Sequence, residues 1–505
     1  MQYQKAGRTE AGLLAVLTGL TVASMVFVIW QASTLQPIRL PALMIDRLSA
    51  IIGLLVAGIG TICFHFSIRY LDGEPGQQRF LRWLFFTVVM AYVLILATNL
   101  LLLIAAWACT SLGLHHLLTF YHHRPEAQRP ARKKFLISRL GDLALLSAIL
   151  VIWFQWGTLD LQIFLQHVAV PTAWSGAPLG AALLIVVAAL TKSAQFPFHT
   201  WLPETMEAPT PVSALMHAGI INAGGFLILR FAPLISAVPE ALFLLALVGT
   251  LTVGFGTLSL WTQTDIKRTL AWSTISQMGF MIIQCGLVVF PAAILHMMGH
   301  GCYKAWSFLR SGGLPDSTIA SPAMEPRSAL AYSAGGTLLA VPALALATRI
   351  TQYDPFHSPG ELALLAMLAL SIGQLWVALF GVHMQHTFMR LSIGLLATMT
   401  IALGACSLYK GAALFFAPVF GQLPGTGTPL HWIAAALPVI LMTSLIVFRA
   451  LLPAIEQSAF GRALYVYALN GFYIGIYANQ IVDWLWRQPT MREKYAAIRR
   501  QKSEA

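Results

Sequence analysis

Charged residues and cysteines are scarce in this sequence, and both shortages narrow what the chain can do. Only 10% of the 505 residues are charged, against about 25% in soluble domains, so the composition suits lipid better than water. The five cysteines lie in apolar runs without a pair at metal or redox spacing, and no glycine-rich phosphate loop follows a strand. The chain therefore has no equipment for electron transfer or nucleotide hydrolysis, and we expect it to hold no cofactor and no metal.

Long apolar runs recur from one end of the chain to the other, and 57% of the residues are hydrophobic. Runs of this length predict roughly 13 or 14 membrane-spanning helices and an all-α polytopic membrane protein. The first run, residues 13–30, resembles a signal peptide. The number of later spans favours an uncleaved first helix instead.

The basic residues that give a net charge of +12 sit in short loops between these runs. In a soluble protein such a charge would indicate nucleic acid, but here it follows from basic loops staying in the cytoplasm. Alternation of the spans then places the N-terminus in the cytoplasm, and we expect no nucleic-acid partner. The segment from Ala463 to Trp486 fits either a span or an interfacial helix.

Lys192 ends an apolar run and precedes Pro197, which must break the helix near residues 195–198 because proline lacks an amide donor. An ionisable side chain in the hydrocarbon region costs at least ~2.5 kcal/mol, so it needs a partner or a role. Beside a helix break a lysine can lose and regain its proton near neutral pH, as a proton relay requires. The alternative is a lysine that extends to the membrane interface.

His296, His300 and Lys304 are spaced four residues apart and therefore share one face of a helix. A column of two imidazoles and an amine suits proton transfer, because neutral histidine both donates and accepts a hydrogen bond. Two alternatives are open. The histidines could hold zinc, although the neighbouring lysine disfavours a cation, or they could be satisfied core residues.

Other ionisable residues near these two segments are weaker candidates. His217 follows one helix after the first lysine and either bridges the two sites or is a core histidine. Asp142 is either the charge partner of that lysine or a counter-ion for Arg139. Glu204 and Glu207 flank the break as relay residues or as helix-end residues.

A histidine-rich and basic segment follows one of the spans. His115, His116, His122 and His123 lead into residues 124–134, where arginine and lysine recur. We interpret this segment as a solvated cytoplasmic loop, with docking of a soluble partner as the alternative.

Three of these segments, residues 191–217, 263–279 and 296–304, resemble the signature of the antiporter-like subunits of respiratory complex I and Mrp sodium/proton antiporters. The resemblance covers roughly residues 40–345 and implies inverted repeats, broken helices at mid-membrane, a lysine relay and a half-channel to each side. On this basis we expect N-terminal helices, a first repeat with the broken helix, a second, degenerate repeat, and C-terminal helices with a basic cytoplasmic tail, over residues 1–97, 98–235, 236–410 and 411–505.

The resemblance also implies roles for individual residues. Lys192 resembles the broken-helix lysine and His217 its bridging histidine. Lys304 resembles the central gate lysine, with His296 and His300 on its helix. Asp142 occupies the place of an acidic residue of the family's Arg-x-Gly-Asp pattern.

The chain departs from the family at two points. The family's Trp-Glu pair supplies the glutamate that partners the broken-helix lysine, but this chain has Ala108 after its tryptophan. The second broken helix should carry a lysine or glutamate, but residues 348–354 lack the family's segment there. The second half-channel would then depend on Arg349, Asp354 or Lys410.

Length, the lost glutamate and the histidine-rich loop make the chain most similar to the membrane subunit of DAB-type inorganic carbon uptake complexes. This branch implies a bacterial inner-membrane location and a large soluble partner on the cytoplasmic face, resembling a zinc β-carbonic anhydrase. We then expect a flow of protons or sodium to drive that partner, with any catalysis and the zinc in the partner. The alternatives are an ion-pumping subunit of complex I or of a membrane hydrogenase, and an Mrp-type antiporter subunit.

Overall fold

The computed structural model describes residues 7–34, 36–169, 176–313, 324–381, 387–421, 423 and 427–486. Helices dominate them, with one antiparallel hairpin of β1 (Ile38–Leu40) and β2 (Leu43–Ile45). The helices are α1 (Arg8–Ser33), α2 (Arg47–Tyr70), α3 (Gln77–Leu96), α4 (Leu100–Leu118), α5 (Pro125–Trp156), α6 (Leu161–Ala169), α7 (Ala177–Lys192), η1 (Leu202–Glu207), α8 (Thr210–Ala218), η2 (Ile220–Asn222), α9 (Ala223–Arg230), α10 (Ala232–Ser236), α11 (Pro239–Thr262), α12 (Ile266–Gly286), α13 (Phe290–Arg310), α14 (Pro326–Thr351), η3 (Pro355–His357), α15 (Pro359–Gly381), α16 (Thr387–Phe420), α17 (Pro429–Ile455), α18 (Ala459–Leu469), η4 (Gly471–Tyr473) and α19 (Ile474–Leu485).

Among the described residues, 11 helices are long and apolar enough to cross a membrane. Helix α12 packs against α11, and α13 packs against α12; α12 and α13 have 21 residues each. The short apolar helix α7 lies between α5 and α9. The prediction of an all-α polytopic membrane protein is therefore confirmed.

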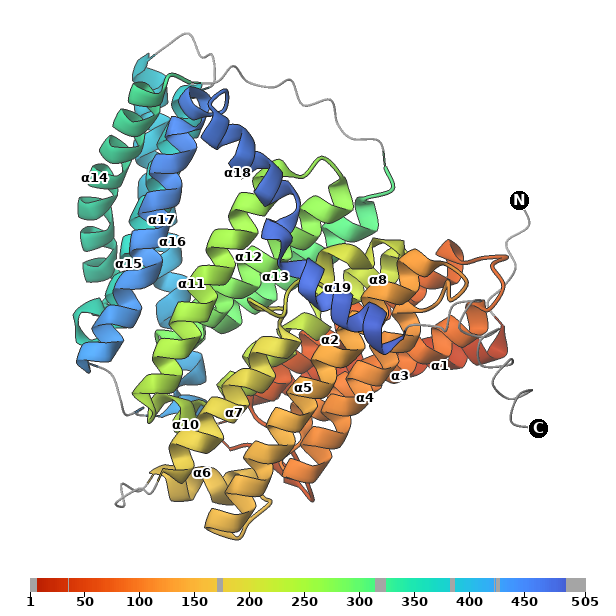
Figure 1. Cartoon of the computed structure of the whole chain (residues 1–505). Coiled ribbons are helices and arrows are strands. Elements are labelled where there is room, and N and C mark those ends of the chain that lie inside the picture. Colours follow the sequence, from red (N-terminus) through yellow and green to blue (C-terminus); the bar gives the residue numbers. More distant parts are fainter. Residues whose placement is uncertain are drawn as a thin grey trace.

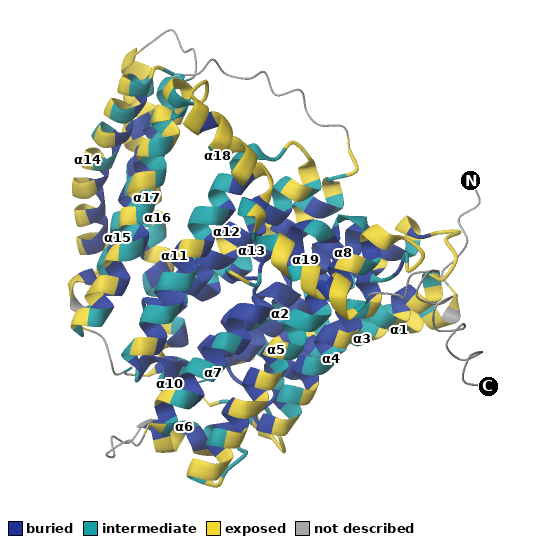
Figure 2. Ribbon diagram, in the orientation of Figure 1, coloured by how far each residue is buried: buried dark blue, intermediate teal, exposed yellow. Residues whose placement is uncertain are grey.

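Burial distinguishes the centre of the bundle from its periphery. The segment that contains α8 and α9 is almost wholly buried, and Figure 2 shows buried residues concentrated around α7, α8 and α2. Helices α14–α17 lie together at one side of the bundle, with α17 packed against α11 (Figure 1), and they expose large apolar side chains, among them Leu338, Leu396, Leu414 and Ile440. Such outward apolar faces suit contact with lipid hydrocarbon.

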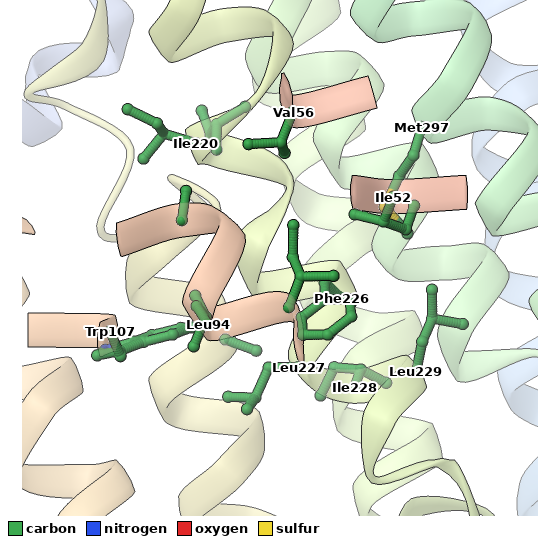
Figure 3. Close-up of a cluster of buried hydrophobic side chains, with 14 of the residues drawn as sticks. Ile52, Val56, Leu94, Trp107, Ile220, Phe226, Leu227, Ile228, Leu229 and Met297 are labelled. Carbon is green, nitrogen blue, oxygen red and sulfur yellow. The ribbon is translucent and has the colours of Figure 1, made fainter. Parts of the chain in front are cut away.

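An apolar cluster joins the helices on which the ionisable residues lie (Figure 3). It includes Ile52 of α2, Leu94 of α3, Trp107 of α4, Phe226 of α9 and Met297 of α13, all buried. Because protein interiors are close-packed, this cluster connects α2, α3, α4, α9 and α13.

The helix is interrupted in the region that Pro197 predicts. Helix α7 ends at Lys192, and regular structure resumes only at η1, so the predicted break near residues 195–198 is confirmed. The freed amide of Phe196 donates to Thr252 Oγ1 of α11 at 3.0 Å. A backbone group left unpaired in a membrane interior would be costly, and the threonine removes that cost.

Helix α14, in contrast, continues unbroken from Pro326 through Pro342 to Thr351. Residues 348–354, where the sequence departs from the family pattern, span the end of α14 at Thr351 and the turn after it, in which Gln352 has a positive φ.

The segment from Ala463 to Trp486 does not form a span. It is divided between α18 and α19 by Gly471, Phe472 and Tyr473, which all have positive φ. Helices of 11 and 12 residues are too short to cross a bilayer. They run from the end of α17 across the bundle to the beginning of α5 (Figure 1), which matches the interfacial interpretation. We call this side of the molecule the α18–α19 face.

Candidate functional site

Lys192 is buried at the end of α7 and its ammonium group faces α4. Nζ donates to Thr110 Oγ1 at 2.8 Å, to Ser111 Oγ at 2.7 Å and to the carbonyl of Trp107 at 3.0 Å. It also lies 4.4 Å from the centroid of the Trp107 ring. Neutral oxygen atoms of α4 therefore surround this lysine, on the helix where the resemblance would place a glutamate at position 108.

A second lysine, Lys134, reaches the same residue of α4. Its Nζ donates to the carbonyl of Ser111 at 2.8 Å, and its side chain is buried. The interpretation of residues 124–134 as a solvated loop is wrong for most of this stretch, because α5 begins at Pro125. Sequence reasoning missed Lys134 because a basic run after a span has the pattern of a cytoplasmic loop.

Asp142 forms an ion pair with Arg139 one turn earlier on α5, with 2.7 Å between Asp142 Oδ2 and Arg139 Nη2. This is the geometry of the counter-ion alternative. The carboxylate also attracts Lys192 and Lys134 electrostatically, without an ion pair to either one in the described structure.

Glu204 and Glu207 lie in η1, on the α18–α19 face of the break. Glu204 accepts from Lys133 Nζ at 2.6 and 2.7 Å, and Glu207 pairs with Arg124 at 3.1 Å. Both carboxylates therefore tie η1 to α5, as helix-end residues would.

His217 lies on α8, fully buried, with its ring stacked on Phe308 of α13 at a centroid distance of 4.4 Å. Neither ring nitrogen has a hydrogen-bond partner among the described residues. Lys304 and His300 of α13 are its electrostatic neighbours. The structure thus brings His217 toward the α13 column.

His296, His300 and Lys304 lie along α13 as the spacing predicts. The two imidazole centroids are 5.8 Å apart, His296 Nδ1 contacts Gln284 Oε1 at 3.0 Å, and Lys304 Nζ donates to the carbonyl of Leu270 at 2.9 Å. Lys304 is fully buried. In the described part of the chain, no three His, Cys, Asp or Glu side chains converge as a metal-ligand set.

A cavity of about 470 Å³ lies beside His296. Tyr353 and Tyr409 line it, and Tyr409 Oη donates to Glu361 Oε1 at 2.8 Å. Sequence reasoning missed Glu361, because an acid in the first turn of a helix is usually a dipole partner.

Arg349, Asp354 and Lys410, the three residues considered for the second half-channel, are not among the residues that line this cavity, although Asp354 and Lys410 directly follow Tyr353 and Tyr409 in the chain. Asp354 accepts from the amide of Phe356 at 3.0 Å and so begins η3. Lys410 donates to the carbonyl of Gln352 at 3.2 Å, and Arg349 lies in the last turn of α14.

Buried lysines and histidines within a polytopic helical bundle are characteristic of an ion-translocating membrane subunit. Residues 97–348 match the family model described as NADH:quinone oxidoreductase/Mrp antiporter, TM, and residues 41–81 match complex I chain 5 N-terminus. The chain belongs to this family of antiporter-like membrane subunits, which confirms the resemblance.

Three of the similar proteins are named as probable inorganic carbon transporter subunits. The probable inorganic carbon transporter subunit DabB2 of Halothiobacillus neapolitanus is 34% identical over 495 residues, which are 94% of this chain and 87% of the relative. The probable subunit DabB of Hydrogenovibrio crunogenus is 41% identical over 268 residues, 52% of each chain, so that match spans about half of the relative.

The fold also occurs in a solved structure of the Mrp complex from Dietzia sp. DQ12-45-1b. The match has a TM-score of 0.58 at 23% identity and covers 97% of this chain and 61% of that one. At this identity the likeness concerns the fold.

Proposed function

We propose that this chain is the membrane subunit of an inorganic carbon uptake complex and that ions moving through its lysine and histidine residues drive a soluble partner. The observation that carries the proposal is the match to DabB2 over 94% of the chain, since that relative is named an inorganic carbon transporter subunit. Lys192, His217, His296, His300 and Lys304 would carry the ion, because each is an ionisable group inside the bundle.

The partner of this proposal is a large soluble protein resembling a zinc β-carbonic anhydrase. It would bind the α18–α19 face, which carries exposed Tyr465, Tyr477 and Trp484. Aromatic side chains are enriched at protein interfaces. Basic residues of the 124–134 segment lie on the same side, so the positive-inside rule makes this face cytoplasmic.

Purification of the tagged chain in mild detergent, followed by mass spectrometry and zinc analysis of co-eluting proteins, tests this assignment. A large zinc protein at about one-to-one stoichiometry is the expected result. Quinone-reductase subunits or a set of small antiporter subunits would instead assign the chain to a redox pump or to an antiporter, and would end the inorganic carbon proposal.

The relay itself is tested by Lys304→Met, which removes the amine and retains most of the side-chain volume. We expect bicarbonate-dependent uptake to be abolished while the complex still assembles, because Lys304 is buried and bonded to one backbone carbonyl. Uptake at the unmodified level would refute conduction through α13.

A further inference from the structure

Resting on the proposed relay, we infer that Lys134 is the proton-exchange partner of Lys192 and that protons, not sodium ions, pass this part of the chain. We call these two residues the two-lysine pair. They come from α5 and α7, and both are bound to Ser111 of α4, Lys192 through the hydroxyl and Lys134 through the carbonyl.

The electrostatics of the two-lysine pair favour one proton shared between two amines. Both side chains are at most 9% exposed, and no ion pair joins either ammonium to a carboxylate in the described structure. Two like charges held close together out of water repel strongly, so the doubly charged state is disfavoured. One lysine can then be neutral and accept the proton that the other releases.

The charged groups around the two-lysine pair do not neutralise the positive charge of the pair, and they leave the exchange possible. Asp142 attracts both amines, but its carboxylate is paired with Arg139, whose positive charge opposes that attraction. His115 lies one turn beyond Ser111 on α4 and interacts electrostatically with Lys134. Among the described residues, these are the further charged and titratable groups that act on the pair.

The positions of the residues along their helices give the exchange a direction. Lys134 is nine residues into α5, hence roughly 13 Å from its beginning on the α18–α19 face at ~1.5 Å per residue. His115 is nearer the end of α4, on the same side, and its Nδ1 is buried without a hydrogen-bond partner among the described residues. In this exchange the proton leaves Lys192 Nζ and binds neutral Lys134 Nζ, and it then leaves Lys134 Nζ and binds His115 Nδ1, so one N–H bond breaks and one forms at each step.

The same geometry disfavours sodium at this point. A hard cation requires several oxygen ligands, preferably carboxylates. The hydroxyls of Thr110 and Ser111 already accept hydrogen bonds from Lys192. A sodium ion would also meet the positive charge of the pair.

Two substitutions of Lys134 separate exchange from a structural role. Lys134→Met removes the amine, and Lys134→Arg retains a donor for the Ser111 carbonyl but never loses its proton. The assay is proton flux into liposomes that contain the purified complex, with external bicarbonate and with or without sodium. We expect the proton flux of both variants to be at least about tenfold lower than that of the unmodified complex. The flux of the unmodified complex should not require sodium.

The control on the same helix is Gln155→Ala, at an exposed position near the other end of α5, which should leave the flux unchanged. The amount of assembled complex is measured for each variant. If the complex with Lys134→Arg does not assemble, the flux of the complex with Lys134→Met alone tests the inference. Wild-type flux in Lys134→Met, full flux in an assembled Lys134→Arg, or a flux that requires sodium would overturn the inference.

Lys304→Met, measured in parallel, separates the two levels of the argument. If it abolishes flux while both Lys134 variants conduct normally, the relay stands and the two-lysine pair is wrong. If Lys304→Met itself conducts normally, the proposed relay function fails.

Discussion

Removing Asp46 should destabilise the fold severely, because it would leave Arg230 buried without its counter-ion. Asp46 Oδ2 is 2.5 Å from Arg230 Nη1, and the second contact, from Nη2 to Oδ1, is 3.4 Å. The side chains are 12% and 4% exposed, respectively. This pair fastens the beginning of α2 to the end of α9, the helix that follows the His217 segment.

The magnitude follows from the two roles of Asp46. Loss of one partner of a buried ion pair costs about 3–5 kcal/mol. Asp46 also accepts from the amide of Ser49 at 2.8 Å as the N-cap of α2, and loss of a cap costs about 1 kcal/mol. We therefore expect Asp46→Ala to destabilise the protein by about 4–6 kcal/mol.

A double-mutant cycle identifies the source of this loss. Arg230→Met combined with Asp46→Ala removes both charges, so the double variant should be more stable than the sum of the two single losses by about 2 kcal/mol or more. The assay is SDS-driven unfolding of the purified protein in mixed micelles. Additive losses, or a cost below about 1 kcal/mol for Asp46→Ala alone, would refute the role of the ion pair.

Three further predictions concern other parts of the molecule. Glu361→Gln retains a hydrogen-bond acceptor for Tyr409 but removes the negative charge. We expect uptake to be about tenfold slower at normal protein levels. Unchanged uptake would show that Glu361 acts only as a helix-end residue. Gly224→Ala would place a Cβ 2.3 Å from the carbonyl of Ala189 and should cost about 1–3 kcal/mol in the same unfolding assay, whereas Gly180→Ala, with open space around it, should not. Burial acts to raise the pKa of Asp46, but the ion pair with Arg230 outweighs it and lowers the pKa. Because the pKa is lower in the folded state, the unmodified protein should have its full stability advantage over Asp46→Asn above the ordinary pKa of 3.8. This advantage should disappear as the pH falls through the folded-state pKa. An advantage that is constant over this acid range would contradict that linkage.

The class of fold and the position of the break could both be predicted from the amino-acid sequence. Recurrent apolar runs predict transmembrane helices because lipid offers no partner to an unpaired backbone. Pro197 predicted the interruption after Lys192, since proline cannot continue the hydrogen-bond ladder. The spacing of His296, His300 and Lys304 likewise fixed their common helix face, which is a local property of 3.6-residue periodicity.

Which ionisable groups meet could be seen only once the helices were packed together. Lys134 and Ser111 are 23 residues apart in sequence, and their contact depends on how α5 packs against α4, which no local pattern encodes. Glu361 and Tyr409 meet across two helices for the same reason. Helix periodicity assigns residues to a face, but the partner of that face is chosen by packing between helices distant in the chain, and there the two-lysine pair and the cavity beside His296 arise.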